Sequence, residues 1–163
     1  MKDDVFFEET QTYATKYETE RRKPMPSYNH GSIQANLIIE LAAYKKKYRP
    51  ISELSLSLNE WISVPDVSLF KWKKLDTKND DIKTTEPPLC AIEILSPTQS
   101  LTELLVKARN YFEYGVKSCW IVLPGLDNIY VFSTAEDYLI FKKGEILKDE
   151  MMGIEIEVSP VFE

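Results

Sequence analysis

Glu93 is the residue of this sequence that most needs a chemical explanation. It lies between Ile92 and Ile94, in the middle of the apolar run 89–95. A carboxylate is costly to bury unless it is paired, hydrogen-bonded or bound to a metal ion. Glu93 is therefore either a buried functional carboxylate or, in the simpler interpretation, a glutamate on a sheet edge that faces solvent.

Asp66 is the second candidate carboxylate. It follows Pro65 and opens an apolar segment that contains Val67 and Leu69. An aspartate at the start of a strand is common and says little by itself. Two carboxylates from neighbouring strands, completed by a backbone carbonyl, are nevertheless the oxygen ligands that Mg²⁺ prefers. Asp66 and Glu93 together form a candidate metal pair.

Lys107 is a cation that could act beside this pair. Its spacing aligns it with Leu104 and Tyr111, so it lies at the border of the apolar stripe of an expected helix. Spacing alone favours a lysine whose stem covers apolar surface while its ammonium group reaches water.

A strand–helix–strand unit must position these side chains. The run 89–95 is typical of a strand covered on both faces. Ser100 and Glu103 form a capping box at the start of the next helix, which Gly115 ends. A strand over 117–123 follows, so the unit predicts two parallel neighbouring strands. The helix is expected to bury Leu101, Leu104, Leu105, Ala108, Tyr111 and Phe112.

The rest of the pattern predicts an α/β fold, in which helices flank a mixed β-sheet and the C-terminal part is rich in strands. The other expected elements are a short strand at 17–23, a helix at 30–48 capped by Asn29, strands at 51–58 and 64–72, a long polar loop at 73–88, and strands at 129–133, 138–142 and 154–158.

Length and composition fit one globular domain over residues 1–163, with 1–16 as a poorly defined lead-in. The chain has 163 residues, of which 44% are hydrophobic, and a net charge of −6. A strongly basic chain would indicate nucleic-acid binding. Here any DNA contact must come from bound metal ions or from local basic clusters, at 21–23, 45–49 and 71–74.

Other whole-chain features indicate a cytoplasmic protein without a membrane segment. No apolar stretch is long enough for a signal peptide or a membrane helix. The two cysteines, Cys90 and Cys119, lie in apolar runs and are interpreted as buried free thiols.

Several blocks of the sequence resemble the Uma-two family of restriction endonucleases, within the PD-(D/E)XK nuclease superfamily. The resemblance covers roughly residues 17 to 162, and its most specific part is the Glu-Ile-Leu-Ser-Pro-Thr block with a lysine and a tyrosine downstream. The blocks are Tyr17-Glu18, Met25-Pro26-Ser27, His30, Pro65-Asp66-Val67, Ala91-Ile92-Glu93-Ile94-Leu95-Ser96-Pro97-Thr98, Lys107 with Tyr111 and Gly115-Val116, and Trp120-Ile121-Val122.

The resemblance implies a restriction-endonuclease-like core that hydrolyses DNA phosphodiesters with Mg²⁺ or Mn²⁺. It implies that Asp66 and Glu93 hold the metal and that the carbonyl of Ile94 completes the ligand shell. The superfamily lysine that usually follows the glutamate by two residues is replaced by Leu95. The resemblance implies that Lys107 takes this role, orienting the attacking water and stabilising charge on the phosphate.

Three supporting residues follow from the same resemblance. Glu18 matches a position that reaches the metal from the first strand, although a surface glutamate is an equal interpretation. His30 is the only histidine, so no two-histidine site can form within one subunit, and a local role at the helix start is favoured. Ser96 is expected to end its strand and support the following loop. Acidic residues that the family often carries around its last motif are absent here, beside Trp120 and before Pro124.

Three functions remain open from the sequence. The first is a metal-dependent DNA endonuclease. The second is a catalytically inactive DNA-binding or protein-interaction module on the same fold. The third is a structural component that forms a homo-oligomer. A homodimer is expected in either the first or the third case, through an apolar patch of the C-terminal part made of Tyr130, Phe132, Tyr138 and Phe141.

Overall fold

The computed structural model describes residues 16–21 and 23–163. The helices are α1 (Lys16–Arg21), α2 (Tyr28–Leu41) and α3 (Leu101–Glu113), with 3₁₀ turns η1 (Ala42–Tyr44), η2 (Pro124–Leu126) and η3 (Ser159–Phe162). The strands are β1 (Tyr48–Ser52), β2 (Ser55–Leu58), β3 (Trp61–Ser63), β4 (Val67–Lys71), β5 (Lys83–Thr84), β6 (Cys90–Ile94), β7 (Ser118–Leu123), β8 (Asn128–Phe132), β9 (Tyr138–Lys142), β10 (Ile146–Asp149) and β11 (Ile154–Glu157).

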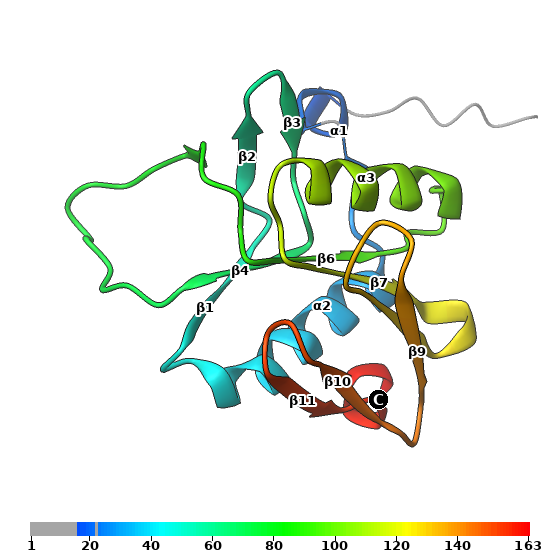
Figure 1. Cartoon of the computed structure of the whole chain (residues 1–163). Helices are drawn as coiled ribbons and strands as arrows, with labels where there is room; N and C mark the ends of the chain where they lie inside the picture. The colour runs from blue at the N-terminus through cyan, green and yellow to red at the C-terminus, as the bar shows by residue number, and fades with distance from the viewer. Residues whose placement is uncertain (1–15, 22) are drawn as a thin grey trace, which may run out of the picture.

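A six-stranded mixed sheet in the order β1-β4-β6-β7-β8-β9 forms the centre of the fold. Strands β6 and β7 are parallel and are joined through α3, whereas the other neighbours in this sheet are antiparallel. Helix α3 lies over one face, and α2 with the β10–β11 hairpin lies over the other (Figure 1). A small sheet, β3-β2-β5, stands beside α3. The expected α/β fold with a strand-rich C-terminal part is confirmed.

The local signals around α3 act as the sequence predicts. The Ser100 hydroxyl accepts a hydrogen bond from the Glu103 backbone N–H at 3.2 Å, which caps the helix. Gly115 has a φ of +93°, a left-handed conformation that glycine adopts without a steric penalty and that ends the helix. Strand β6 is buried along its whole length, as expected for a strand between two covering layers.

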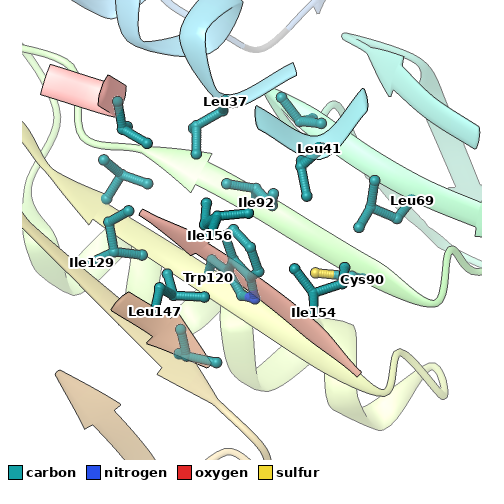
Figure 2. Packing of buried hydrophobic residues seen from close by; sticks show 14 of the residues in the cluster. Leu37, Leu41, Leu69, Cys90, Ile92, Trp120, Ile129, Leu147, Ile154 and Ile156 are labelled. Atoms are coloured by element: carbon teal, nitrogen blue, oxygen red, sulfur yellow. The ribbon is translucent and has the colours of Figure 1, made fainter. Parts of the chain in front are cut away.

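Two apolar clusters fill the space on either side of the sheet. The first packs α2, the β10–β11 hairpin and η3 against the sheet, with Leu37, Leu41, Ile92, Trp120 and Ile156 among its members (Figure 2). The second packs α3 and β2 against the opposite face, and it includes Leu56, Leu104, Tyr111 and Ile121. Because β-strand side chains alternate between faces, Ala91 belongs to the second cluster and its neighbour Ile92 to the first.

Four of the expected elements are wrong in type or extent. Residues 17–23 are not a strand, since 16–21 form the short helix α1, and the run lacks the apolar alternation that a strand needs. Helix α2 begins after Ser27, whose side chain accepts from the His30 N–H, and ends at Leu41. The expected strand 51–58 is divided at Glu53, where φ is +50°. The expected strand 64–72 begins only at Val67.

Smaller differences concern burial and the chain ends. Leu101 and Leu105 of α3 are exposed, because only the side facing the sheet is covered. The polar segment 73–88 contains the two-residue strand β5, and the C-terminal part has an additional strand, β10. Residues 1–15 of the expected lead-in lie outside the described residues.

Two expectations about the whole chain can be compared with the structure. Cys90 and Cys119 are buried free cysteines, as expected. Among the helices of residues 16–21 and 23–163, none has the length and apolar character needed to cross a membrane.

Candidate active site

Asp66 lies just before β4, and Glu93 lies on the neighbouring strand β6. Val67 of β4 pairs with Ile92 of β6 in antiparallel register, so the next pair along this register is Asp66 and Glu93. Residues opposite each other in an antiparallel pair lie on the same face, with Cβ atoms roughly 5 Å apart. Both side chains are buried, each with 1% of its surface exposed. The solvent-facing interpretation of Glu93 is therefore wrong.

Two residues of α3 hold the Glu93 carboxylate. Its Oε1 atom accepts a hydrogen bond from the Tyr111 hydroxyl at 2.6 Å and another from the Lys107 ammonium at 3.1 Å. The Tyr111 hydroxyl is also 2.7 Å from the Ser63 hydroxyl of β3. Lys107 thus does not simply reach into water: 22% of its side chain is exposed, and its charge is directed at Glu93.

Asp66 has a different set of partners. Its Oδ2 atom accepts a hydrogen bond from the Ile94 backbone N–H at 2.7 Å. Its Oδ1 atom lies 2.5 Å from the Lys23 ammonium and 3.1 Å from His30 Nε2. The Lys23 ammonium and the His30 ring thus both lie beside the same buried oxygen, Oδ1.

The pKa shifts of Asp66 and Lys107 show which charged groups lie near them. Burial alone would raise the pKa of the Asp66 carboxyl, but the contacts with His30 and Lys23 outweigh burial and lower this pKa below its usual value. Burial would lower the pKa of Lys107, but the Glu93 charge, with a smaller contribution from Asp66, raises it. Lys107 is therefore close enough to respond to both carboxylates.

Tyr111 stays protonated in this environment. Burial raises the pKa of its hydroxyl well above the usual value, and the neighbouring Glu93 charge raises it further. A hydroxyl that keeps its proton can only donate to an ionised carboxylate. Tyr111 therefore fixes the position of Glu93.

A surface depression is lined in part by Lys107. Its volume is about 560 Å³, and Lys107 lines it together with Pro24, which follows Lys23 in the chain. The N-terminal half of α3 supplies most of the remaining wall. Neither Asp66 nor Glu93 lines this depression, so Lys107 is the candidate catalytic residue that a ligand in it can contact.

The supporting residues divide into three cases. His30 contacts Asp66 and is buried, so it is more than a local residue at the helix start. Ser96 is buried after β6, and its backbone N–H donates to the Gln99 side chain, in keeping with a role in supporting the loop. Glu18 lies in α1 and not on a strand, and its side chain lies outside the described part of the structure.

Sequence reasoning missed Lys23 and Gln34. Lys23 is buried, and its ammonium also donates to the Val64 carbonyl at 3.1 Å. Gln34 of α2 donates to the Asp66 carbonyl at 3.0 Å. Lys23 ends the basic run 21–23, which has the composition of a solvated surface. The proline after it, Pro24, is a signal only for the end of a helix.

The basic clusters 45–49 and 71–74 meet each other, but not at the carboxylates. Lys45, Lys46, Arg49 and Trp72 line a second depression of about 360 Å³. The Arg49 guanidinium lies 6.0 Å from the centre of the Trp72 ring. Lys71 is five residues beyond Asp66 along β4, which corresponds to a separation of about 17 Å. The third cluster, 21–23, contributes Lys23 to the candidate site itself.

Comparisons with known proteins identify one family and one similar fold. A family model described as "Uma2: Putative restriction endonuclease" matches residues 17–159. The crystal structure of "a putative nuclease belonging to DUF820" from Anabaena variabilis ATCC 29413 superposes with a TM-score of 0.74 and 22% sequence identity, covering 85% of this chain and 83% of that chain. No curated protein matches the sequence. At this identity, the crystal structure supports the fold.

Proposed function

Since this chain belongs to the Uma2 family of restriction endonuclease-like proteins, we propose that it is a metal-dependent endonuclease that hydrolyses DNA phosphodiester bonds in the cytoplasm. The observation that carries the proposal is a pair of buried carboxylates, Asp66 just before β4 and Glu93 on the neighbouring strand β6, linked by the hydrogen bond from the Ile94 N–H to Asp66. A fold gains little from two buried acids at adjacent positions unless a shared cation gives them a function.

The residues present suit Mg²⁺ or Mn²⁺ with few protein ligands. No group of three or more His, Cys, Asp or Glu side chains among the described residues could hold a metal ion. Mg²⁺ is usually held by one or two carboxylates and keeps water and substrate phosphates as its other ligands. Asp66 Oδ1 already lies beside the Lys23 ammonium, so the surroundings of this oxygen favour a cation. Asp66, Glu93 and the Ile94 carbonyl would form the protein part of the shell.

The bound metal would supply an acidified water and neutralise charge on the phosphate. Lys107 would stabilise the charge that develops on the phosphate oxygens, because it lines the depression and its ammonium contacts Glu93. Tyr111 would keep the Glu93 carboxylate in one orientation. His30 and Gln34 would position Asp66 from its side chain and its backbone.

Lys23 introduces a competition into this proposal. Its ammonium lies 2.5 Å from Asp66 Oδ1, the oxygen that would face a metal ion. We infer that Lys23 is the resident counter-ion of the metal-free site and that a divalent cation must displace it. Two lysines balance two carboxylates, so the metal-free site is close to neutral and metal affinity is reduced.

DNA would also contact the basic surface made of Lys45, Lys46, Arg49 and Trp72. This depression contains three cations and an aromatic ring that a base could stack on, and no acid lines it. Replacing Lys45 and Lys46 together with glutamate should weaken DNA binding and flatten its dependence on salt, as measured by fluorescence anisotropy. Lys117→Glu combined with Lys143→Glu, two exposed changes elsewhere, is the control with the same change in charge. Equal salt slopes for both variants would contradict this contact surface.

A silent module on the same fold is the second candidate, and one observation favours it. Each carboxylate already has a lysine partner and is buried from solvent. The charges of the two carboxylates are therefore balanced without a metal ion. Such a module would use the DNA-binding or protein-interaction surfaces without hydrolysis.

The deciding experiment is cleavage of supercoiled plasmid, branched DNA and single-stranded DNA with Mg²⁺ or Mn²⁺. Asp66→Asn and Glu93→Gln keep hydrogen-bonding capacity but remove the charge, and they are used beside the alanine variants after folding is checked by circular dichroism. Glu113→Ala, an exposed change on α3, is the control. We expect cutting that needs metal, is lost in both carboxylate variants and is kept in the control. No cutting of any substrate, or equal cutting by all variants, would favour the silent module.

A further inference from the structure

Strand β9 leaves one edge of the central sheet without a partner among the described residues. It is the last strand of the six-stranded sheet. Tyr138, Leu139 and Ile140 are exposed at 51%, 59% and 43% of their surfaces. A sheet edge made of consecutive apolar residues is a template for pairing with another strand. The patch expected from the sequence is altered, because Phe132 is buried and Leu139 and Ile140 contribute instead.

The hydrogen bonds of the β8–β9 hairpin show which backbone groups of β9 point outward. The Ser133 N–H donates to the Asp137 carbonyl, and the Lys143 N–H donates to the Asp127 carbonyl. The odd-numbered residues 137–143 therefore face β8. The even-numbered residues Tyr138, Ile140 and Lys142 face outward.

Only part of this outward edge is open. The Lys142 N–H donates to the Glu145 side chain at 2.8 Å, and the Lys142 carbonyl accepts from the Glu145 N–H at 3.0 Å. The outward N–H and carbonyl groups of Tyr138 and Ile140 have no such internal partner in the described part of the chain. A pairing strand can therefore use two residues, one on each side of Leu139.

We propose that β9 pairs antiparallel with β9 of a second copy of this chain, about a two-fold axis at Leu139. In this register Tyr138 of one copy lies opposite Ile140 of the other, and each such pair exchanges two backbone hydrogen bonds. A shift that centres the pairing on Ile140 would instead require the Lys142 backbone groups that Glu145 already occupies.

The charges around β9 are self-complementary in the same register. Glu136 and Asp137 precede the strand, whereas Lys142 and Lys143 end it. Antiparallel pairing about Leu139 places Glu136 of each copy opposite Lys142 of the other. A parallel arrangement would place like charges together, which is unfavourable. This match between the two ends of one strand favours a second copy over an unrelated chain as the occupant.

The register makes a single-cysteine test possible. Leu139 would face its counterpart in a pair without hydrogen bonds, where the two Cα atoms are about 4.5 Å apart, a separation that a disulfide accepts. In Ile140→Cys the two thiols would instead lie two residues apart along the strands, beyond disulfide range. The native Cys90 and Cys119 are buried and do not interfere.

We expect Leu139→Cys to form a covalent dimer under mild oxidation and Ile140→Cys to remain monomeric on a non-reducing gel. Analytical ultracentrifugation of the wild type should show a dimer whose fraction rises with concentration. Glu136→Lys and Lys142→Glu should each reduce this fraction, and the double variant should restore it. A wild type that stays monomeric at all concentrations, or cross-linking of Ile140→Cys as efficient as that of Leu139→Cys, would overturn the proposed interface. DNA cleavage plays no part in these measurements, so they stand apart from the nuclease proposal.

Discussion

Replacing Lys23 with methionine separates the structural and the metal-related roles of the Asp66 carboxylate. Methionine keeps most of the length and apolar stem of lysine but removes the ammonium group that lies 2.5 Å from Asp66 Oδ1 and 3.1 Å from the Val64 carbonyl. The carboxylate then keeps only His30 and the Ile94 N–H as partners. We expect a less stable metal-free protein that gains more stability from metal than the wild type does.

The size of the first effect follows from burial. Removing one partner of a buried ion pair typically costs about 3–5 kcal/mol, because the remaining charge is uncompensated. For a chain of this size, 1 kcal/mol corresponds to a change in Tm of roughly 2–4 °C. Lys23→Met should therefore lower the Tm of the metal-free protein by on the order of 10 °C. Lys148→Met, which removes an exposed partner of Glu155, should have little effect.

The second effect is measured by thermal unfolding in EDTA and across a Mg²⁺ or Mn²⁺ titration. A ligand that binds the folded state raises stability by RT ln(1 + [L]/Kd). Because no lysine competes for Oδ1, Lys23→Met should have a lower Kd and a larger metal-induced increase in Tm than the wild type. Equal increases in the two proteins, with a normal loss of stability in EDTA, would refute the idea that Lys23 and the metal compete for one oxygen.

Three further predictions concern the buried polar groups. The pKa of Asp66 is lower in the folded protein than its ordinary value of 3.8. The ionised Asp66 therefore contributes its full stabilisation at pH values above the ordinary pKa. This stabilisation is lost as the pH falls through the pKa of the folded state. The difference in unfolding free energy between wild type and Asp66→Asn should be constant above about pH 5 and shrink below about pH 4, as measured by urea unfolding. A difference that grows in acid would contradict this sign. The buried Asp149 carboxylate accepts hydrogen bonds from the Ser118 hydroxyl, the Trp120 indole and the Met152 N–H at 2.5, 2.7 and 3.1 Å. Asp149→Ala should lower the free energy of unfolding by about 3 kcal/mol or more, because it leaves these buried donors unpaired. An unchanged midpoint of urea unfolding would show that water replaces the carboxylate. Burial raises the pKa of the Cys90 and Cys119 thiols. Iodoacetamide should therefore label these cysteines only after the protein unfolds. Rapid labelling of the native protein would show that strands β6 and β7 open readily.

The strand–helix–strand unit could be predicted because its signals are local. The apolar run of β6, the capping serine Ser100 and the helix-ending Gly115 each lie within a few residues of the structure that they determine. The elements that failed depend on distant contacts. The sequence of helix α1 has no clear apolar pattern. The division between β1 and β2 at Glu53 reflects a distant contact, because the Glu53 N–H donates to the Asp66 carbonyl.

In the candidate site too, the residues with local sequence signals could be predicted and those that depend on distant contacts could not. Glu93 and Asp66 are visible in the sequence because each charge interrupts an apolar segment. Lys107 lies on the helix next to the Glu93 strand, so the crossover brings it to the carboxylate. Lys23 could not be found in this way, because its run 21–23 has the composition of a surface and its burial arises from a contact with Asp66, far away in the chain.

The two lysines together bear on which function the fold performs. A site built only to hold a divalent cation tightly would leave its carboxylates without other cations, since their negative charge provides the affinity. Here Lys107 neutralises Glu93 and Lys23 neutralises Asp66, so the site gains stability as it stands. Lys107 lines the surface depression, and 22% of its side chain is exposed. Lys23 is buried and cannot leave Asp66 without a cation to replace it. Under the proposed function, metal loading and the release of Lys23 would therefore be one event, and a chain in which that exchange does not occur would be a binding module.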